Sequence, residues 1–280
     1  METQELALLV ELSEARAYAS LIQAAPEPFL REHGLLAVPI ESAVAIVAQS
    51  ITNTLNMNRV IGLGVAEAAT DALVAQIVGL YEERGLPFGI EVGPFARPKE
   101  IPGWLRARRI RRGVATAMQY RDARRLEAKA GPVSVIRAPH SARETVADIC
   151  CSVFRMPPAA HALIAGTANK PEWRQWIAYS GSRPAAAALS FVYAGIAWLG
   201  WDATLPEFRG QGAQSSLIVH RVNEAADAGC KYITTETAIN AATNTDPSYR
   251  NYERLGFSCA YERATFVALR AANRHGTKAS

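Results

Sequence analysis

The chain has 280 residues, which is long enough for two domains at roughly 100–200 residues each. Hydrophobic residues make up 49% and charged residues 20%, so the composition supplies two packed cores and argues against intrinsic disorder. The formal net charge of +4 is too small to indicate a nucleic-acid partner by itself.

Two features bear on membranes and compartment. The segment Met1–Glu5 has no basic region before an apolar run, so we expect no signal peptide. The longest apolar stretch, Ala185–Trp201, is near the lower limit for a membrane span, but Ser190 and Tyr193 interrupt it. A β-hairpin turning near Ala194-Gly195 fits better than a membrane helix. We therefore expect a cytoplasmic protein that does not contact a membrane.

Cysteine and histidine spacing does not favour a metal site. The four cysteines form no CxxC pair, and the five histidines show no ligand spacing. We expect reduced thiols and no bound metal. The cysteines are Cys150, Cys151, Cys230 and Cys259.

In the first half of the chain, hydrophobic periodicity predicts helices and strands in alternation. Helices are expected over Thr3–Ile22 and over Ala68–Glu83, the second ending at Gly85. The other expected elements are strands at Val44–Val47, Asn58–Leu63, Phe88–Val92 and Val114–Tyr120, and a helix at Ile101–Arg108.

The segment Arg121–Gly131 is charged and precedes Pro132, which indicates a linker between domains at 1–127 and 128–280. A capping box over Ser141–Glu144 predicts the start of a helix that runs to Phe154, and Pro157-Pro158 starts another. The remaining elements are strands at Val133–Arg137, Gln175–Tyr179, Ala186–Tyr193, Ile196–Thr204, Tyr232–Thr237 and Ala264–Leu269, and helices at Gln214–Ala228 and Ser248–Leu255. Because both halves follow one order of elements, we infer a repeat of architecture.

The most informative motif, Pro206–Gln214, lies between an expected strand and helix. Gly210 and Gly212 allow close approach of the backbone to a ligand, and the first N–H groups of the helix have no partner within it. Such a turn suits a pyrophosphate. The GxxxxGK[ST] motif is absent, and Ser215 replaces the third glycine of a dinucleotide motif. A glycine turn with a purely structural role is the alternative.

This turn resembles the acetyl-CoA-binding motif of the GNAT (GCN5-related) N-acetyltransferase family, Arg/Gln-x-x-Gly-x-Gly/Ala. Arg209 and Gly212 match the motif, whereas Gln214 replaces a small residue. Asn244 followed by Tyr252–Phe257 is similar to the family's Asn … Tyr-Glu-x-x-Gly-Phe ending, with one residue more between them. The resemblance covers 133–269, and the whole chain resembles bacterial two-domain GNAT proteins with a degenerate N-terminal domain.

The resemblance implies an α/β fold of two tandem GNAT-like domains, each a mixed, partly splayed sheet flanked by helices. It also implies an acetyl-CoA-dependent N-acetyltransferase whose acceptor, a small-molecule or peptide primary amine, attacks the thioester directly. The residues that would contact acetyl-CoA are Ala203, Thr204 and Leu205 along the pantetheine arm, Arg209, Gly210, Gln211, Gly212, Ala213, Gln214 and Ser215 at the pyrophosphate, and Asn244.

Two residues are candidates for catalysis. Tyr252 matches the tyrosine that often serves as general acid in the family, with Tyr249 one turn earlier and a plain packing role as alternatives. Glu236, late in a strand beside the expected cleft, is the candidate base. An ion-paired carboxylate is an equally good interpretation of Glu236, and Asp202 is a weaker candidate base.

One basic run, with arginines at 106, 108, 109, 111 and 112, has only Trp104 near it, so a solvated surface is favoured over a nucleic-acid site. A non-catalytic acyl-CoA-binding regulatory module is the main alternative to an enzyme, because both would need the same turn. Acceptor identity and oligomeric state do not follow from the sequence.

Overall fold

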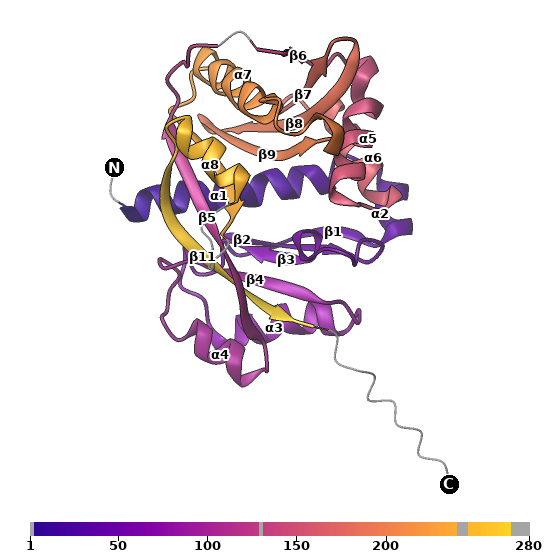
Figure 1. The fold of residues 1–280 in the computed structure, drawn as a ribbon. Coiled ribbons are helices and arrows are strands. Elements are labelled where there is room, and N and C mark those ends of the chain that lie inside the picture. Colours follow the sequence, from indigo (N-terminus) through magenta and orange to yellow (C-terminus); the bar gives the residue numbers. More distant parts are fainter. Residues whose placement is uncertain (1–2, 129–130, 240–245, 270–280) are drawn as a thin grey trace.

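One mixed sheet runs through the molecule, with helices on both of its faces (Figure 1). The computed structural model describes residues 3–128, 131–239 and 246–269. Within these residues the sheet has eleven strands in the order β1-β2-β3-β4-β11-β5-β10-β9-β8-β7-β6. This arrangement confirms the mixed α/β class expected from the sequence.

The strands are β1 (Leu35–Ile40), β2 (Ala43–Ala48), β3 (Arg59–Ile61), β4 (Phe88–Val92), β5 (Arg111–Asp122), β6 (Val133–Arg137), β7 (Trp173–Ser180), β8 (Arg183–Tyr193), β9 (Ile196–Thr204), β10 (Tyr232–Ala238) and β11 (Ser258–Ala268). The α-helices are α1 (Thr3–Ile22), α2 (Glu27–His33), α3 (Asp71–Glu82), α4 (Ile101–Ala107), α5 (Arg143–Phe154), α6 (Pro158–Gly166), α7 (Ala213–Asp227) and α8 (Pro247–Arg254).

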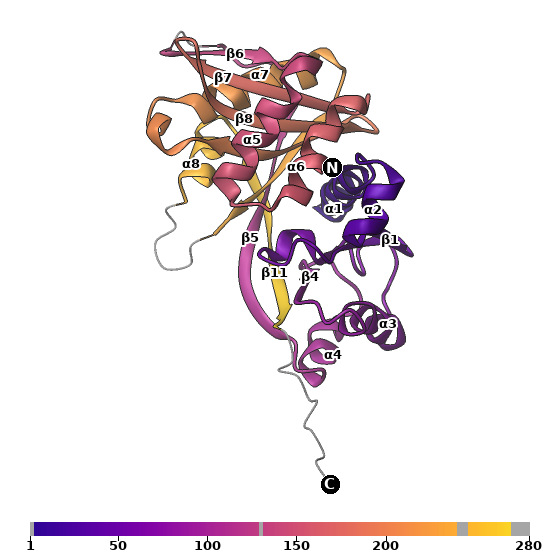
Figure 2. The same ribbon diagram turned by 90° about the vertical axis from the view of Figure 1, so that its right-hand side faces the viewer.

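The two halves repeat one pairing pattern and exchange their last strands. β2-β3-β4 and β8-β9-β10 each contain an antiparallel pair followed by a parallel pair. β11, from the end of the chain, pairs with β4 of the first half, whereas β5 of the first half pairs with β10. β5 and β11 also pair with each other, and Figure 2 shows both passing between the halves. Strands from both sides of position 128 therefore alternate at the centre of the sheet, and the division into 1–127 and 128–280 stays a prediction.

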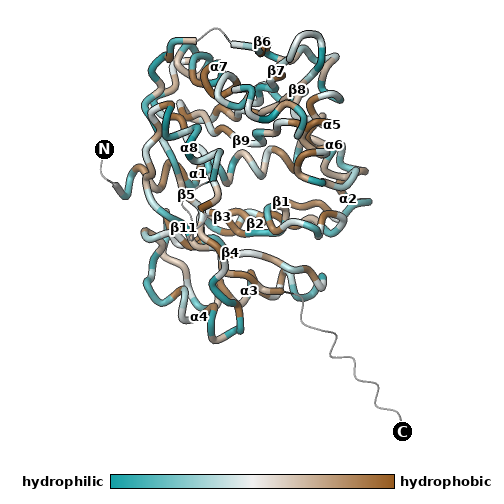
Figure 3. The backbone as a smooth tube through the Cα atoms, in the orientation of Figure 1, coloured by the Kyte–Doolittle hydropathy of each residue, from teal (hydrophilic) through white to brown (hydrophobic). Residues whose placement is uncertain are grey.

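Helix α1 lies between the two halves and joins their cores (Figure 1). Its apolar residues share one buried cluster with β2 of the first half and with α5, α6, β8 and β9 of the second. The other face of β2 packs against α3 and α4. Because both faces are covered, every residue of β2 is buried, which explains its unbroken apolar sequence. In Figure 3 hydrophobic residues accordingly recur in the strands of the sheet and in the helices packed on it.

The apolar stretch 185–201 forms the β8–β9 hairpin, as expected. Ala194 and Gly195 connect the strands with φ angles of 48° and 77°, the left-handed values of a tight hairpin turn. Within the three described ranges, no helix combines the length and apolarity that crossing a bilayer requires.

Three local predictions were incomplete or wrong. The capping box at Ser141 does not form, because α5 begins at Arg143 after a short 3-10 turn and no side chain caps it. Helix α2 and strand β1 were not anticipated. The last strand was expected over Ala264–Leu269 but begins at Ser258, because β11 pairs with β5 along its whole length.

Candidate functional site

The cleft of the second half opens where two parallel strands separate. β9 and β10 pair in parallel only as far as Leu199 and Thr235, although β9 continues to Thr204 and β10 to Ala238. Beyond that last pair the strands diverge, and a cavity of about 1570 Å³ extends between them. It reaches from the turn before α7 to helix α1, so it is continuous from one end of the cleft to the other.

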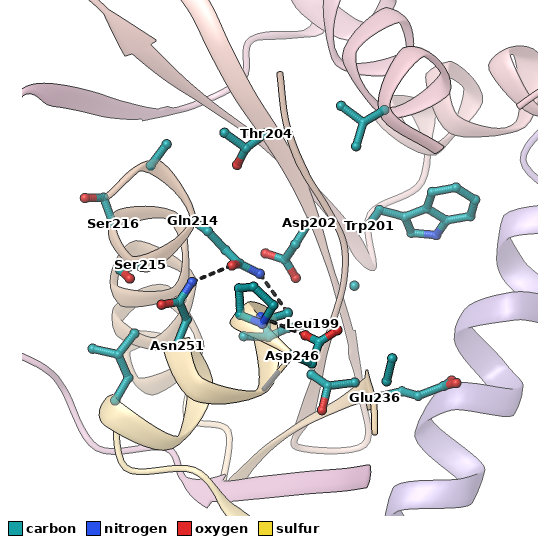
Figure 4. Close-up of a pocket in the computed structure, with 18 of the residues that line it drawn as sticks. Leu199, Trp201, Asp202, Thr204, Gln214, Ser215, Ser216, Glu236, Asp246 and Asn251 are labelled. Carbon is teal, nitrogen blue, oxygen red and sulfur yellow. Dashed lines mark hydrogen bonds between the residues drawn. The ribbon is translucent and has the colours of Figure 1, made fainter. Parts of the chain in front are cut away.

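A β-bulge shapes the wall of this cleft. Along the β8–β9 ladder Leu189 faces Gly200 and Ala187 faces Ala203, so Trp201 and Asp202 together oppose a single residue of β8. Trp201 has a φ of 57°, a left-handed value that is uncommon for a bulky residue. Both side chains line the cavity (Figure 4). The bulge thus re-aims two side chains where the strands part.

The turn before α7 has the geometry of an anion site. Gly210 and Gly212 have φ angles of 79° and 80°, and no atom lies within 4 Å of a Cβ built on either glycine. Gly212 is the N-cap of α7, and no side chain caps this helix. The N–H groups of its first turn consequently have no intrahelical partner, and the positive end of the helix dipole adds to their attraction for an anion. Arg209 is exposed beside them and lines the same cavity.

The structure brings most of the predicted acetyl-CoA-contacting residues to one end of the cavity. The residues from this set that line it are Thr204, Arg209, Gly210, Gly212, Ala213, Gln214 and Ser215. Gln211 instead lies beside Ser180, whose hydroxyl donates to its Oε1 at 3.3 Å. Ala203 is buried, and the N–H of Leu205 donates to the carbonyl of Ala185 at 3.0 Å. Asn244 lies outside the described residues.

Gln214, the departure from the family motif, points toward α8. Its Nε2 donates to the Ser248 hydroxyl at 2.8 Å, and its Oε1 accepts from Asn251 Nδ2 at 2.7 Å (Figure 4). Asp246 caps α8 by accepting from the N–H groups of Ser248 and Tyr249 at 2.8 and 3.2 Å. The longer side chain therefore ties the α7 turn to α8, and its backbone N–H stays at the helix N-terminus.

Tyr252 lies behind the cavity wall. Its side chain is fully buried, and its hydroxyl donates to Asp202 Oδ2 at 2.6 Å. Arg221 donates to the same hydroxyl at 3.3 Å and forms an ion pair with Asp202. Burial and the adjacent Asp202 carboxylate hold the pKa of Tyr252 well above its usual value, although Arg221 opposes the rise. Asp202, which does line the cavity, stands between this phenol and the open space.

Glu236 lines the opposite end of the cavity and belongs to a buried charge cluster. Its carboxylate accepts from Arg59 Nη1 at 3.0 Å and from Arg263 Nη2 at 3.1 Å. Burial alone would raise the pKa of Glu236, but Arg59, a hydrogen bond from Glu14 and Arg263 together hold it well below its usual range. The carboxylate is therefore ionised and tightly ion-paired.

Glu14, on α1, is a fully buried carboxyl group of the same cluster. Burial raises the pKa of Glu14 to about 8, and nearby Glu236 adds to the rise while Arg263 and Arg59 oppose it. The two carboxyl groups share a hydrogen bond. Their surroundings therefore shift the two pKa values in opposite directions, that of Glu14 upward and that of Glu236 downward.

Comparison with solved structures identifies the architecture. A "GCN5-related N-acetyltransferase" from Kribbella flavida has a TM-score of 0.61 at 14% identity, over 89% of this chain and 95% of that chain. A protein of the same description from Sphaerobacter thermophilus gives 0.61 at 15% identity, over 91% of both chains. A "tandem GNAT protein from the clavulanic acid biosynthesis pathway" gives 0.54 at 16% identity, over 77% of this chain and 75% of that chain. The chain has the tandem GNAT fold. No family model and no curated protein sequence matches it.

In the first half of this GNAT fold, the turn equivalent to the α7 turn is filled by the chain itself. A Cβ on Gly64 would lie 2.5 Å from the carbonyl oxygen of Arg97, whose N–H donates to the Gly64 carbonyl at 2.8 Å. Helix α3 is capped by Thr70, whose hydroxyl accepts from the N–H of Leu73 at 3.1 Å. Arg97 thus occupies the space that an anion would need at this turn, and Thr70 already accepts from one N–H of the first turn of α3.

Sequence reasoning missed the contribution of α1 to this site. Tyr18 lines the cavity, with Arg59 stacked on its ring at 4.5 Å, and Glu14 hydrogen-bonds to Glu236. The sequence does contain a signal for this contribution, because Glu11 and Glu14 lie on the same face of the helix as Ala7, Val10 and Tyr18. Carboxylates on an otherwise apolar stripe indicate buried partners.

Proposed function

We propose that this protein is an acyltransferase that uses acetyl-CoA to acetylate the primary amine of a small molecule or peptide by direct attack on the thioester. The observation that carries the proposal is the continuity of one cavity from an uncapped helix N-terminus to a buried carboxylate on the far side of two splayed strands. At about 1570 Å³ it exceeds the ~300–1,000 Å³ of an ordinary ligand pocket, which leaves room for a co-substrate and an acceptor together.

The residues at the α7 turn fit a pyrophosphate. Gly210 and Gly212 present open backbone with no atom within 4 Å of an added Cβ, and Arg209 supplies positive charge at the rim. The backbone N–H groups of Gly212, Ala213, Gln214 and Ser215 would hold the phosphate oxygens. Thr204 lines the path from this turn toward the bulge, where the pantetheine arm would lie.

Acetyl-CoA supplies an acetyl group activated as a thioester. In the transfer a bond forms between the acceptor nitrogen and the carbonyl carbon, the carbon–sulfur bond breaks, the nitrogen loses a proton and the sulfur gains one. We propose that Glu236 holds the amine at the cavity wall while its proton leaves through water in the cleft, because the lowered pKa makes the Glu236 carboxylate itself a weak base. We propose the Tyr252 hydroxyl, joined to the cleft through Asp202, as the source of the proton for sulfur.

One observation favours a second candidate, a non-catalytic acyl-CoA-binding regulatory module. Among the described residues that line the cavity there is neither Tyr249 nor Tyr252, so neither phenol reaches the space where a thiolate would form. Such a module would bind acetyl-CoA at the same turn and release no thiol in the presence of amines.

A two-part experiment separates the candidates. Calorimetry with acetyl-CoA tests the turn, and a thiol-release assay against alkylamines, aromatic amines, amino sugars, amino acids and short peptides tests the chemistry. We expect binding together with amine-dependent thiol release and an acetylated product by mass spectrometry. Binding without release for every amine would favour the regulatory module, and no binding would overturn both.

A further inference from the structure

The cluster around Glu236 contains more carboxylates than cations. Four carboxyl groups, from Glu11, Glu14, Glu91 and Glu236, surround the guanidinium groups of two arginines, Arg59 and Arg263, at 2.7–3.5 Å. The two arginine side chains are 2% and 0% exposed, so solvent does not screen this imbalance.

Protons and one further positive charge can balance the cluster. Burial raises the pKa values of Glu14 and Glu91, and with one of the two protonated three carboxylates still face two guanidinium groups. The carboxylate through which the cluster meets solvent is Glu236, whose side chain is 16% exposed against 0–3% for Glu11, Glu14 and Glu91. A cation from outside would therefore bind at Glu236.

Glu236 can accept such a cation. Its Oε2 accepts hydrogen bonds from both arginines, at 3.0 and 3.1 Å, whereas its Oε1 accepts one long bond from Arg59, at 3.3 Å. An ionised carboxylate has about four acceptor sites, so Oε1 can take an ammonium N–H without displacing either arginine. Figure 4 shows Glu236 on the side of the cavity away from Gln214 and Asn251.

Apolar and aromatic side chains line another part of the cavity, and of these Tyr18 is the one that contacts the cluster, through the Arg59 guanidinium on its ring. Tyr18 and Trp198 are in edge-to-face contact at 5.7 Å, and so are Phe154 and Trp201. All four line the cavity, together with Met156. Aromatic faces attract both a flat apolar body and an organic cation.

Basic side chains line the cavity elsewhere. Among the described lining residues they are Arg209, His220 and Arg254, which come from the α7 turn, α7 and α8 at the other end. An acceptor that carried its own carboxylate or phosphate would thus find no cation near Glu236 that is not already paired. The charge of this end selects against acidic acceptors.

We propose that the acceptor is a small monoamine with a flat apolar or aromatic body and no acidic group, and that Glu236 binds its ammonium before acetylation. The inference rests on the proposed function. It assigns the aromatic wall, with Tyr18 from the N-terminal helix and Phe154 from α5, to recognition of the acceptor's body.

Calorimetry on the protein saturated with CoA tests binding separately from catalysis. The probes are 2-phenylethylamine, 2-phenylethanol without the charge, phenylalanine with an added carboxylate, and ethylamine without the ring. We expect 2-phenylethylamine to bind best, and Glu236→Gln to weaken it about 10- to 100-fold, the range of a hydrogen bond to a charged group. Glu207→Gln, on the exposed turn before α7, is the matched control and should change nothing for this probe.

An affinity for CoA equal to that of the wild-type protein would show that the Glu236→Gln variant is folded. Phe154→Ala, at a side chain that is 42% exposed, provides a second variant that leaves the buried cluster intact and should weaken 2-phenylethylamine but not ethylamine. Equal or tighter binding of phenylalanine by the wild-type protein would overturn the inference, and so would unchanged binding of 2-phenylethylamine by a folded Glu236→Gln variant. If other amines are acetylated and 2-phenylethylamine is not, the inference fails while the proposed function stands. If no amine releases thiol, both fail.

Discussion

Replacing Gly212 with Asp should abolish tight acetyl-CoA binding through charge alone. Gly212 has a φ of 80°, and no atom lies within 4 Å of an added Cβ, so the new side chain meets no steric conflict. Asp and Asn both tolerate left-handed backbone better than other residues with a side chain, at about 1–2 kcal/mol or less. Both also cap helices, which offsets part of this cost. The fold should therefore survive either substitution.

The electrostatic effect can be worked out from the position. A carboxylate here would lie about 4 Å from a pyrophosphate bound at the first turn of α7. Two unit charges at that separation repel by about 4 kcal/mol at an effective dielectric constant of 20, and by about 1 kcal/mol in bulk water. Gly212 is exposed, so the true value lies between these limits. We expect acetyl-CoA to bind about 10- to 100-fold more weakly.

Gly212→Asn is the matched control, because it has the same shape and backbone preference without the charge. In calorimetry the Gly212→Asn variant should bind acetyl-CoA with an affinity within about fivefold of wild type. The Gly212→Asp variant should bind it far more weakly. The difference in acetyl-CoA affinity between the two variants should decrease in 1 M salt, where the Debye length falls to about 3 Å. Equal affinities of the Asp and Asn variants at low salt would refute the pyrophosphate assignment.

Three further results are expected. Tyr252→Phe should lower kcat about 10²-fold, because the hydroxyl would protonate sulfur, and should leave acetyl-CoA affinity unchanged. Tyr249→Phe should behave like wild type. Calorimetry should count one acetyl-CoA per chain, since Arg97 fills the equivalent turn of the first half. Glu14→Gln should gain stability relative to wild type in urea denaturation as the pH rises from about 4.5 to about 8, because burial raises the pKa of Glu14.

The sign of the last prediction follows from the raised pKa of Glu14. Its contribution to stability is fully present below the ordinary value of 4.5 and is lost as the pH rises through about 8, whereas glutamine does not titrate. A difference in unfolding free energy that does not vary with pH would contradict it. Full activity of Tyr252→Phe would leave that phenol a packing role, and two acetyl-CoA sites per chain would contradict the stoichiometry.

Local signals in the sequence predicted most of the elements and the α7 turn. The turn could be predicted because glycines, a helix start and Arg209 lie within a few residues of one another. The exchange of β5 and β11 could not be predicted, because β11 pairs with β4 about 170 residues earlier. A hydrophobic pattern does not indicate which distant strands pair with each other.

The charge cluster around Glu236 could not be predicted from the sequence for the same reason. Arg59 and Arg263 lie some 200 residues apart and look like ordinary polar residues of separate strands. Glu236 could be placed beside the cleft by its position late in a strand. Its tight pairing with both arginines, which sets its protonation, depends on strands that meet only in the folded chain.

The strand exchange also has a consequence for biosynthesis. During translation the first half emerges complete except for β11, so the edge of β4 has no partner until residues 258–268 leave the ribosome. β5 likewise waits for β10 to be made. Neither half can close its sheet ahead of the other, and α1 carries Glu11 and Glu14 without Arg263 during that interval. The chain is therefore expected to gain protease resistance in one late step, once β11 has emerged, rather than half by half.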